Sequence, residues 1–368
     1  MMEENKKIII LHDTFLYKGW WERFVLMMAK TLWADLASGF FSKGSFDLRK
    51  EGFKWKIIPV STEIFKKGFR HIRLKKDFIY KTKFLSKYDI VIFSWDCLSA
   101  VRNCKIWAKK IYFCHTPPRY LYDLRIQYLK KVPFLLKPIF NILSSIFKKM
   151  YESDIKKIDL ILTNSENTKN RLKKFIWFDS QVLYPPVILD KFKFLKQEDY
   201  YVSASRLSWA KRIDNIVKAF LKMPDKKLVV IYWENDPQKK EIFDLAKNAK
   251  NIEFKTFPWN IGFTECIGNS IAGICIPIDE DFWMIPVESM AAWKPVLWVN
   301  EWGLKETIIH KKTWFLVPEW WNPDDLVDVI TNFLTPEKCL NMKQDCEERA
   351  KYFSYEKFEK QVKNYIKS

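Results

Sequence analysis

Residues 273–299, which read GICIPIDEDFWMIPVESMAAWKPVLWV, contain two short apolar runs on either side of a mixed segment. The runs at 273–277 and 295–299 have the length and the composition of buried strands. The segment between them begins acidic, and Glu288 stands near the start of a helical pattern. Two buried strands joined through a helix pair in parallel, so this stretch predicts a strand–helix–strand unit of an α/β fold.

The same alternation extends outward over the whole chain. Further short apolar runs, each read as a strand, lie at 7–11, 57–60, 90–93, 111–114, 159–163, 200–203, 228–232 and 252–254. Helices are expected at about 22–32, after a Ser165 cap, at 213–221 and at 354–368, with a loop over 12–21. Each half of the chain therefore predicts an open parallel sheet with helices on both faces.

The length of 368 residues predicts two domains, because one hydrophobic core rarely grows so large. We expect a first domain over 1–190 and a second over 191–353, with the helix at 354–368 packing back on the first. Two Rossmann-like domains would face each other across a cleft. In such sheets ligands bind at the carboxyl ends of the strands.

The composition narrows the function classes. We find no apolar stretch of the ~18 residues that a spanning helix needs and no signal-peptide pattern, so we expect a cytoplasmic protein. The seven cysteines form no Cys-x-x-Cys pair and are interpreted as reduced core thiols. With only four histidines, a metal site is not expected.

The positive charge lies in the first half. Residues 1–190 hold 36 Lys and Arg against 18 Asp and Glu, whereas residues 191–368 hold 27 against 26. Residues 120–150 interleave lysines with Phe, Leu and Ile, which suits an amphipathic helix on an anionic membrane, at its inner face in the cell. The alternative is a core-packing helix with a solvated basic face. Nucleic-acid binding is the less favoured use of this charge.

Glycine is rare and tryptophan abundant. The chain has 9 Gly and 17 Trp, whereas average usage of about 7% glycine would give roughly 26. Trp20, Trp21, Trp293, Trp302 and Trp314 stand where a turn or a strand-to-helix loop favours glycine. We hypothesise that UGA codons that mean glycine in the source organism are written here as tryptophan. The alternative is a tryptophan-rich protein that uses indoles for core packing or sugar stacking.

The segment 279–296 carries the strongest chemical signal. Glu280 and Glu288 are separated by seven residues, and the segment closely resembles the E-x7-E signature of family 4 glycosyltransferases, with Trp283 and Trp293 at its glycine positions. The resemblance implies a GT-B fold, a retaining reaction, and contacts of Glu280 with the donor sugar and of Glu288 with the ribose. A solvated acidic loop before a helix is the structural alternative.

Residues 205–212, which read SRLSWAKR, resemble the family's Arg-Leu-x-x-x-Lys segment. The resemblance implies that Arg206 and Lys211 neutralise the donor diphosphate, and that the backbone amides of Met284 and Ile285 face it. Cations at this place stabilise the charge that grows on a leaving nucleoside diphosphate without a metal ion. An Arg and a Lys that merely solvate a helix start are the alternative.

Two further segments belong to the first half. Residues 18–23, which read KGWWER, resemble the glycine-rich turn that lets amides approach the donor phosphate, with Gly19 kept and Trp20 and Trp21 departing from it. Residues 114–123, which read CHTPPRYLYD, resemble a segment of the mannosyltransferase-like branch and place His115 at the donor site. His12 and Asp13 are expected to line the acceptor side.

The resemblance implies transfer of a hexosyl group, with mannosyl as one candidate, from a nucleotide diphosphate sugar such as GDP-mannose. The acceptor would be a saccharide or a lipid-linked saccharide of envelope polysaccharide synthesis. Two alternatives stay open: a synthase of a soluble disaccharide or sugar phosphate, and a non-catalytic protein that binds membrane or nucleic acid through its basic half.

Overall fold

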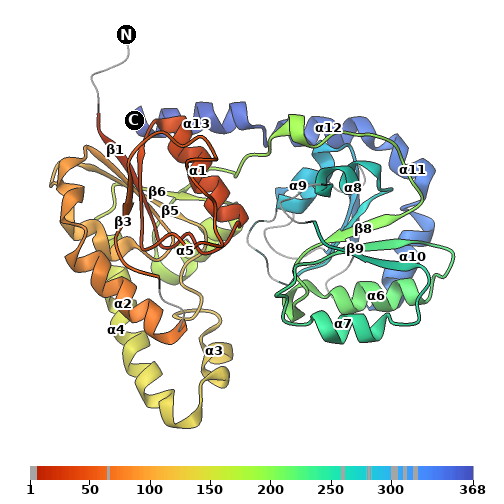
Figure 1. Ribbon diagram of the computed structural model, residues 1–368, viewed down its shortest axis with the longest axis horizontal. Helices are drawn as coiled ribbons and strands as arrows, with labels where there is room; N and C mark the ends of the chain where they lie inside the picture. The colour runs from red at the N-terminus through yellow and green to blue at the C-terminus, as the bar shows by residue number, and fades with distance from the viewer. Residues whose placement is uncertain are drawn as a thin grey trace. The chain divides into compact units, whose positions relative to one another are not determined.

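The computed structural model describes residues 6–63, 67–257, 262–278, 280, 282, 284–299, 306–309, 313–317 and 322–367, with the backbone alone for 67–69 and 314–317. The chain divides into two compact units (Figure 1). The first comprises Met1–Tyr184 with Glu359–Ser368, and the second Pro185–Phe358.

The first unit is built on a seven-stranded sheet in the order β3-β2-β1-β4-β5-β6-β7, and every pairing in it is parallel. Its strands are β1 (Ile8–His12), β2 (Asp35–Ser38), β3 (Ile57–Pro59), β4 (Ile90–Ser94), β5 (Lys109–Cys114), β6 (Leu160–Thr163) and β7 (Gln181–Val182). The strand order reverses between β1 and β4, which makes this the switch point where ligands of such sheets bind.

Helices cover both faces of this sheet. They are α1 (Trp20–Leu32), α2 (Lys67–Tyr80), α3 (Arg125–Lys131), α4 (Lys137–Ile155) and α5 (Glu166–Ile176), with 3₁₀ turns η1 (Lys83–Lys87), η2 (Leu98–Asn103) and η3 (Phe134–Leu136). Ile9, Leu11 and Phe93 pack with α2, η2 and α4 in one core cluster. On the other face, Phe24 of α1 contacts the ring of Phe113, with centroids 4.6 Å apart. Alternation along the strands thus directs each side chain to one of two helical layers.

The end of α13 (Tyr355–Lys367) belongs to the first unit. Lys109 donates from Nζ to the carbonyl oxygens of Tyr365 and Ile366, at 2.7 and 3.2 Å. The Tyr365 hydroxyl lies 3.4 Å from the carbonyl oxygen of Val182. These bonds join the last helix to the strands β5 and β7.

The second unit holds a six-stranded parallel sheet in the order β10-β9-β8-β11-β12-β13. Its strands are β8 (Tyr201–Ala204), β9 (Leu228–Ile231), β10 (Ile252–Lys255), β11 (Gly273–Cys275), β12 (Val296–Val299) and β13 (Trp314–Val317). Its helices are η4 (Leu189–Lys191), η5 (Trp209–Lys211), α6 (Ile213–Leu221), α7 (Lys239–Leu245), α8 (Phe263–Asn269), α9 (Met284–Ala291), α10 (Pro323–Asn332), α11 (Pro336–Asn341) and α12 (Lys343–Lys351).

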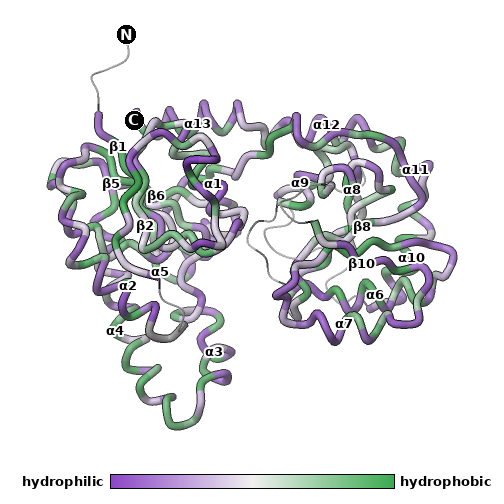
Figure 2. Tube along the Cα trace, in the orientation of Figure 1, coloured by the Kyte–Doolittle hydropathy of each residue, from purple (hydrophilic) through white to green (hydrophobic). Residues whose placement is uncertain are grey.

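The predicted α/β class with two Rossmann-like parallel sheets is confirmed. Hydrophobic segments run through the strands of both sheets (Figure 2). Ser165 caps α5 as predicted, since its side chain accepts a hydrogen bond from the Thr168 amide. Two details of the prediction were wrong: the loop expected over 12–21 ends earlier because α1 begins at Trp20, and Trp314 begins strand β13 instead of lying in a turn. Trp302 lies outside the described residues.

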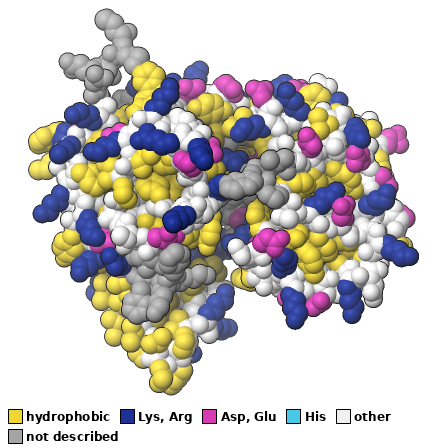
Figure 3. Space-filling view, in the orientation of Figure 1, with side chains coloured by type: hydrophobic (Ala, Val, Ile, Leu, Met, Phe, Trp, Pro, Cys, Tyr) yellow, Lys and Arg dark blue, Asp and Glu magenta, His cyan; other side chains and the backbone are white. Residues whose placement is uncertain are grey.

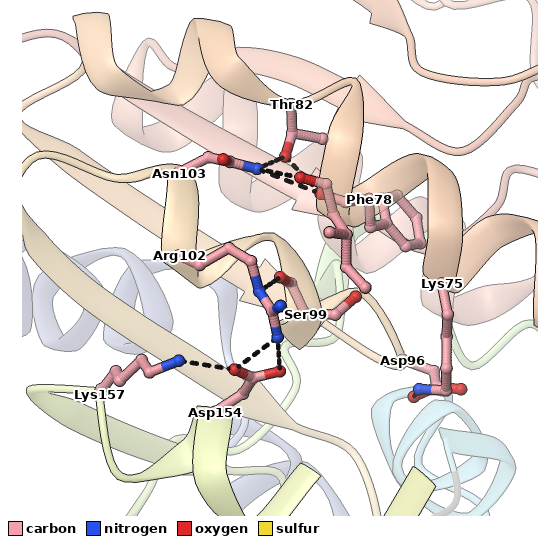
Figure 4. A network of polar contacts seen from close by, with 10 residues as sticks. Lys75, Phe78, Thr82, Asp96, Ser99, Arg102, Asn103, Asp154 and Lys157 are labelled. Carbon is pink, nitrogen blue, oxygen red and sulfur yellow. Dashed lines mark hydrogen bonds and ion pairs between the residues drawn. The ribbon is translucent and has the colours of Figure 1, made fainter. Parts of the chain in front are cut away.

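A polar network fastens α4 and α2 to the η2 segment (Figure 4). The carboxylate of Asp154, which is 1% exposed, accepts two hydrogen bonds from Arg102 at 3.2 Å and one from Lys157 at 2.9 Å. Asn103 donates to the Ile79 carbonyl and to the Thr82 hydroxyl, each at 2.8 Å. A buried carboxylate with charged partners is held firmly, so this end of α4 is well anchored.

The other end of α4 is not embedded in the sheet layers. Together α3, η3 and the first turns of α4 extend away from the sheet of the first unit (Figure 1). Residues 120–150 are therefore two helices joined at Pro133 through a 3₁₀ turn, not the single amphipathic helix that we predicted. We call residues 125–149 the helical arm.

Candidate functional site

Three neighbouring strands of the first unit bring polar side chains to one edge of the sheet. His12 ends β1, Ser94 ends β4, and His115 follows β5 directly. Parallel pairing sets His12 opposite Ser94 and Ser94 opposite Phe113, so the three side chains meet at the carboxyl ends of the strands. Ser94 comes 82 residues after His12 in the chain, and only the strand order brings the two together.

Ser94 links the two histidines. Its Oγ lies 3.0 Å from His12 Nδ1 and 2.8 Å from His115 Nε2, and all three residues are at most 2% exposed. A hydroxyl can donate one hydrogen bond and accept another, so both imidazoles can be joined while neutral. Burial lowers the pKa of His12 to about 3 and the pKa of His115 well below its ordinary value. His115 Nδ1 has no hydrogen-bond partner in the described part of the chain.

Indoles surround His115. The Trp21 ring lies edge-on to the imidazole with centroids 4.3 Å apart, and the Trp95 ring stacks on it at 5.1 Å and 19°. The Trp20 ring contacts Trp21 in turn, with centroids 5.2 Å apart. Trp20 and Trp21 form the first turn of α1. The two residues predicted to bind the donor from a loop therefore lie at the start of a helix. The Trp21 side chain packs against His115, which the prediction also places at the donor site, whereas the Trp20 ring contacts Trp21 and Phe24.

Gly19 precedes α1 in an ordinary extended conformation, with φ −81° and ψ 168°. Its carbonyl accepts the Arg23 amide at 3.2 Å, and a Cβ at Gly19 would clash with the Glu22 carboxylate. Burial raises the pKa of Glu22, which also accepts hydrogen bonds from nearby backbone amides. Of these amides, that of Glu22 itself lies in the first turn of α1, whereas those of Leu16 and Tyr17 precede the helix.

Asp13 lines a small pocket beside the histidines. The pocket also contains Arg70, His71, Lys75 and Asp96. Lys75 donates to Asp96 Oδ1 at 2.8 Å, and Asp13 Oδ1 lies 3.4 Å from His12 Nε2. Burial raises the pKa of Asp13 to about 8, against the effect of a hydrogen bond from the Thr14 amide. The acceptor-side role predicted for His12 and Asp13 therefore falls on a buried imidazole and a partly exposed carboxyl, both mostly neutral.

In the second unit, the loops after β8 and β11 lie side by side. The Ile278 amide donates to the Ala210 carbonyl at 2.8 Å, and Lys211 Nζ donates to Glu280 Oε2, also at 2.8 Å. The Lys211 side chain is 15% exposed and that of Glu280 is 31% exposed. Lys211 and Glu280, which were predicted from separate motifs, thus form one ion pair beyond the carboxyl ends of the neighbouring strands β8 and β11.

Arg206 points more freely into solvent. Its side chain is 66% exposed, with Nε 3.5 Å from Asp236 Oδ1. Asp236 itself is buried, and its Oδ2 accepts the amides of Leu207 and Trp233, each at 2.9 Å. Sequence reasoning missed Asp236, which holds together the loops after β8 and β9.

The helix α9 begins four residues after Glu280 in the chain. Met284 is its first residue, and the amides of Met284 and Ile285 belong to its amino-terminal turn, where N–H groups lack helical acceptors. Glu288, one turn further on, is 6% exposed. Glu280 and Glu288 are thus a half-exposed loop residue and a buried helix residue. Trp283, also predicted to bind the donor, lies outside the described residues.

Comparison with known proteins finds a family match for part of the second unit. Residues 187–353 match the family described as "Glycosyl transferases group 1". The "Alpha-1,3/1,6-mannosyltransferase ALG2" of Saccharomyces cerevisiae is 27% identical over 252 residues, which is 55% of this chain and 48% of that protein. The chain therefore spans about half the length of this relative. The family match covers less than half of the chain and lies within the second unit.

Solved structures share the fold over almost the full length. HepE of Anabaena, in complex with UDP and glucose, has a TM-score of 0.76 at 14% identity, covering 99% of this chain and all of that one. Sucrose-phosphate synthase of Thermosynechococcus elongatus has a TM-score of 0.77 at 15% identity, covering 98% of both chains. At such low identity these likenesses show the GT-B fold alone.

Proposed function

We propose that this protein transfers a hexosyl group, with mannosyl as the first candidate, from a nucleotide diphosphate sugar to a saccharide or lipid-linked acceptor with retention at the anomeric carbon. The observation that carries this proposal is the Lys211–Glu280 pair, which joins two motifs within the segment that matches glycosyl transferases group 1. The mannosyltransferase name of the yeast relative supports mannose.

The donor would bind to the second unit. Lys211 and the exposed Arg206 supply positive charge for a diphosphate, and the first amides of α9 add donors of the kind that hold anions at helix starts. Glu280 is assigned to the sugar hydroxyls, because a carboxylate that accepts from one lysine keeps further acceptor sites. Glu288 is assigned to the ribose.

In the transfer step, the bond between the anomeric carbon and the β-phosphate oxygen breaks, and the acceptor oxygen bonds to the same face of that carbon. The proton of the acceptor hydroxyl passes to the leaving diphosphate. Arg206, Lys211 and the α9 amides stabilise the charge that develops there, and no metal ion is required. His115, being neutral, would hydrogen-bond the donor sugar without supplying charge.

Calorimetry with GDP-mannose and UDP-glucose tests the proposal. We would use the chain as written and a version with glycine at all 17 tryptophan positions. Arg206→Ala and Glu288→Ala should each weaken binding by about 10- to 100-fold, since a hydrogen bond to a charged group contributes about 1.5–3 kcal/mol. Lys218→Ala, on the exposed side of α6, is the matched control and should bind normally. If neither version binds a nucleotide sugar, the proposal fails.

We also propose that the helical arm holds the enzyme against the anionic inner face of a membrane, where a lipid-linked acceptor would lie. Large apolar side chains on the arm are exposed: Ile126, Tyr128, Phe134, Leu135, Leu136, Ile139, Ile142 and Ile146. Figure 3 shows hydrophobic atoms gathered over the end of the molecule that the arm forms. The exposed Lys130, Lys131 and Lys149 accompany them. None of the described helices is both long and apolar enough to cross a bilayer.

Vesicle sedimentation tests this placement. With vesicles containing phosphatidylserine, Lys130→Glu with Lys131→Glu should weaken binding at least tenfold, because each basic residue near the surface contributes about 1 kcal/mol. The same charge change at Lys173 and Lys174 in α5 is the matched control. Equal loss in both pairs, or equal binding to purely zwitterionic vesicles, would contradict a specific role of the arm.

A further inference from the structure

Tryptophan occupies backbone positions that favour glycine. In the described part of the chain, the non-glycine residues with positive φ are Trp33, Trp95, Trp177, Arg212 and Trp293, with φ between 51° and 68°. A positive φ is uncommon outside glycine, and Asn and Asp account for many of the exceptions. Here no Asn or Asp appears and four of the five are tryptophan, although tryptophan makes up only 17 of 368 residues.

Three of these tryptophans follow the last turn of a helix. After α1, the Trp33 amide bonds to the Lys30 carbonyl at 3.3 Å and the Ala34 amide to the Ala29 carbonyl at 2.9 Å. This pair of bonds is the Schellman motif, in which the residue with positive φ is usually glycine. Trp293 repeats the motif after α9, with Lys294 bonded to Ser289 and Trp293 to Met290, each at 2.9 Å.

The third, Trp177, ends α5 through a single bond from its amide to the Lys173 carbonyl at 3.2 Å. Packing does not explain the choice of an indole there, because the side chains of Trp177 and Trp33 are 87% and 66% exposed. Trp293 differs, since its ring stacks on Phe194. At the two exposed positions, 33 and 177, the side chain is largely in solvent, and the positive φ of the backbone favours glycine.

We infer that glycine is the residue that the cell inserts at positions 33, 95, 177 and 293. We extend the inference to position 21, where the segment KGWWER departs from a glycine-rich turn. Trp95 directly follows Ser94 and has φ 68°, and its ring and that of Trp21 cover two sides of His115. The native protein would therefore expose the His115 ring, whose Nδ1 is unpartnered in the described chain, to an open space that admits a hydroxyl-bearing ligand. Only the nature of that ligand rests on the proposed function.

Peptide mass spectrometry of the protein purified from its own cells tests the residue identity. Peptides that contain positions 33, 95 and 177 should carry the mass of glycine, and the gene should have UGA at these positions. Tryptophan in any of these peptides would overturn the inference. This readout needs no substrate, so it is independent of whether the protein transfers sugars.

A second measurement uses the recombinant chain and tests the open face of His115. We would compare the chain as written with Trp21→Gly plus Trp95→Gly, and follow modification of each histidine by diethyl pyrocarbonate. His71 is exposed and serves as the internal reference. Modification of His115 relative to His71 should rise at least tenfold in the double variant. An unchanged ratio, with both proteins folded by circular dichroism, would show that the indoles do not close this face.

Discussion

The tryptophans with positive φ predict a difference in stability between two substitutions that both remove an exposed indole. Trp177→Gly and Trp107→Gly each remove a largely exposed indole, 87% and 80% exposed, and each adds the same glycine entropy to the unfolded chain. Only Trp177 has a positive φ. Relief of the left-handed conformation is worth about 1–2 kcal/mol, so Trp177→Gly should be more stable than Trp107→Gly by that amount.

Scanning calorimetry measures this difference directly. Both positions lie in the first unit, so both variants act on the same unfolding transition. For a unit of this size, 1 kcal/mol corresponds to about 2–4 °C, and the melting temperatures should differ by about 2–8 °C. Circular dichroism before heating confirms that both variants are folded. Equal melting temperatures, or a lower one for Trp177→Gly, would refute the reasoning that the backbone at this position favours glycine.

Two further predictions concern the strand ends of the first unit. Between pH 5 and 6 the unfolded chain binds protons at His12 and His115 that the folded chain does not bind. Folded Asp13 keeps a proton that the unfolded chain releases. The unfolded chain therefore binds a net excess of about one proton at pH 5, so stability should rise with pH by roughly 1.4 kcal/mol per pH unit at most, and the rise should end at about pH 6.5, where the histidines of the unfolded chain are half deprotonated. His115→Gln should nearly abolish this slope in urea titrations, and an unchanged slope would show that His115 is protonated in the folded protein. Gly39→Ala should cost about 1–3 kcal/mol in the same assay, because the added Cβ meets the Asp13 carbonyl oxygen, whereas Gly44→Ala, with nothing nearer than 3.9 Å, should be neutral. Equal losses of unfolding free energy in Gly39→Ala and Gly44→Ala would mean that the backbone near Asp13 shifts to make room for the added Cβ.

The candidate residues of the second unit were proposed from the sequence. Arg206 and Lys211 belong to one short segment, and Glu280 and Glu288 to another, and the resemblance of these segments to family 4 glycosyltransferases drew attention to them. The structure adds that the two segments touch through the Lys211–Glu280 ion pair. That contact depends on β8 and β11 being neighbours, a property of strand order that spacing along the chain does not carry.

The sequence by itself determined the α/β alternation, the two-sheet class, the acidic and basic motifs, and the anomaly of 17 tryptophans against 9 glycines. These follow from local periodicity and composition, which need no knowledge of the fold. Only the tertiary structure joined His12, Ser94 and His115, because parallel pairing aligns strand ends that are far apart in the chain. It also showed the positive φ at Trp33 and Trp177, since a backbone angle is fixed by the hydrogen bonds and the helix end around it, not by the residue type written there.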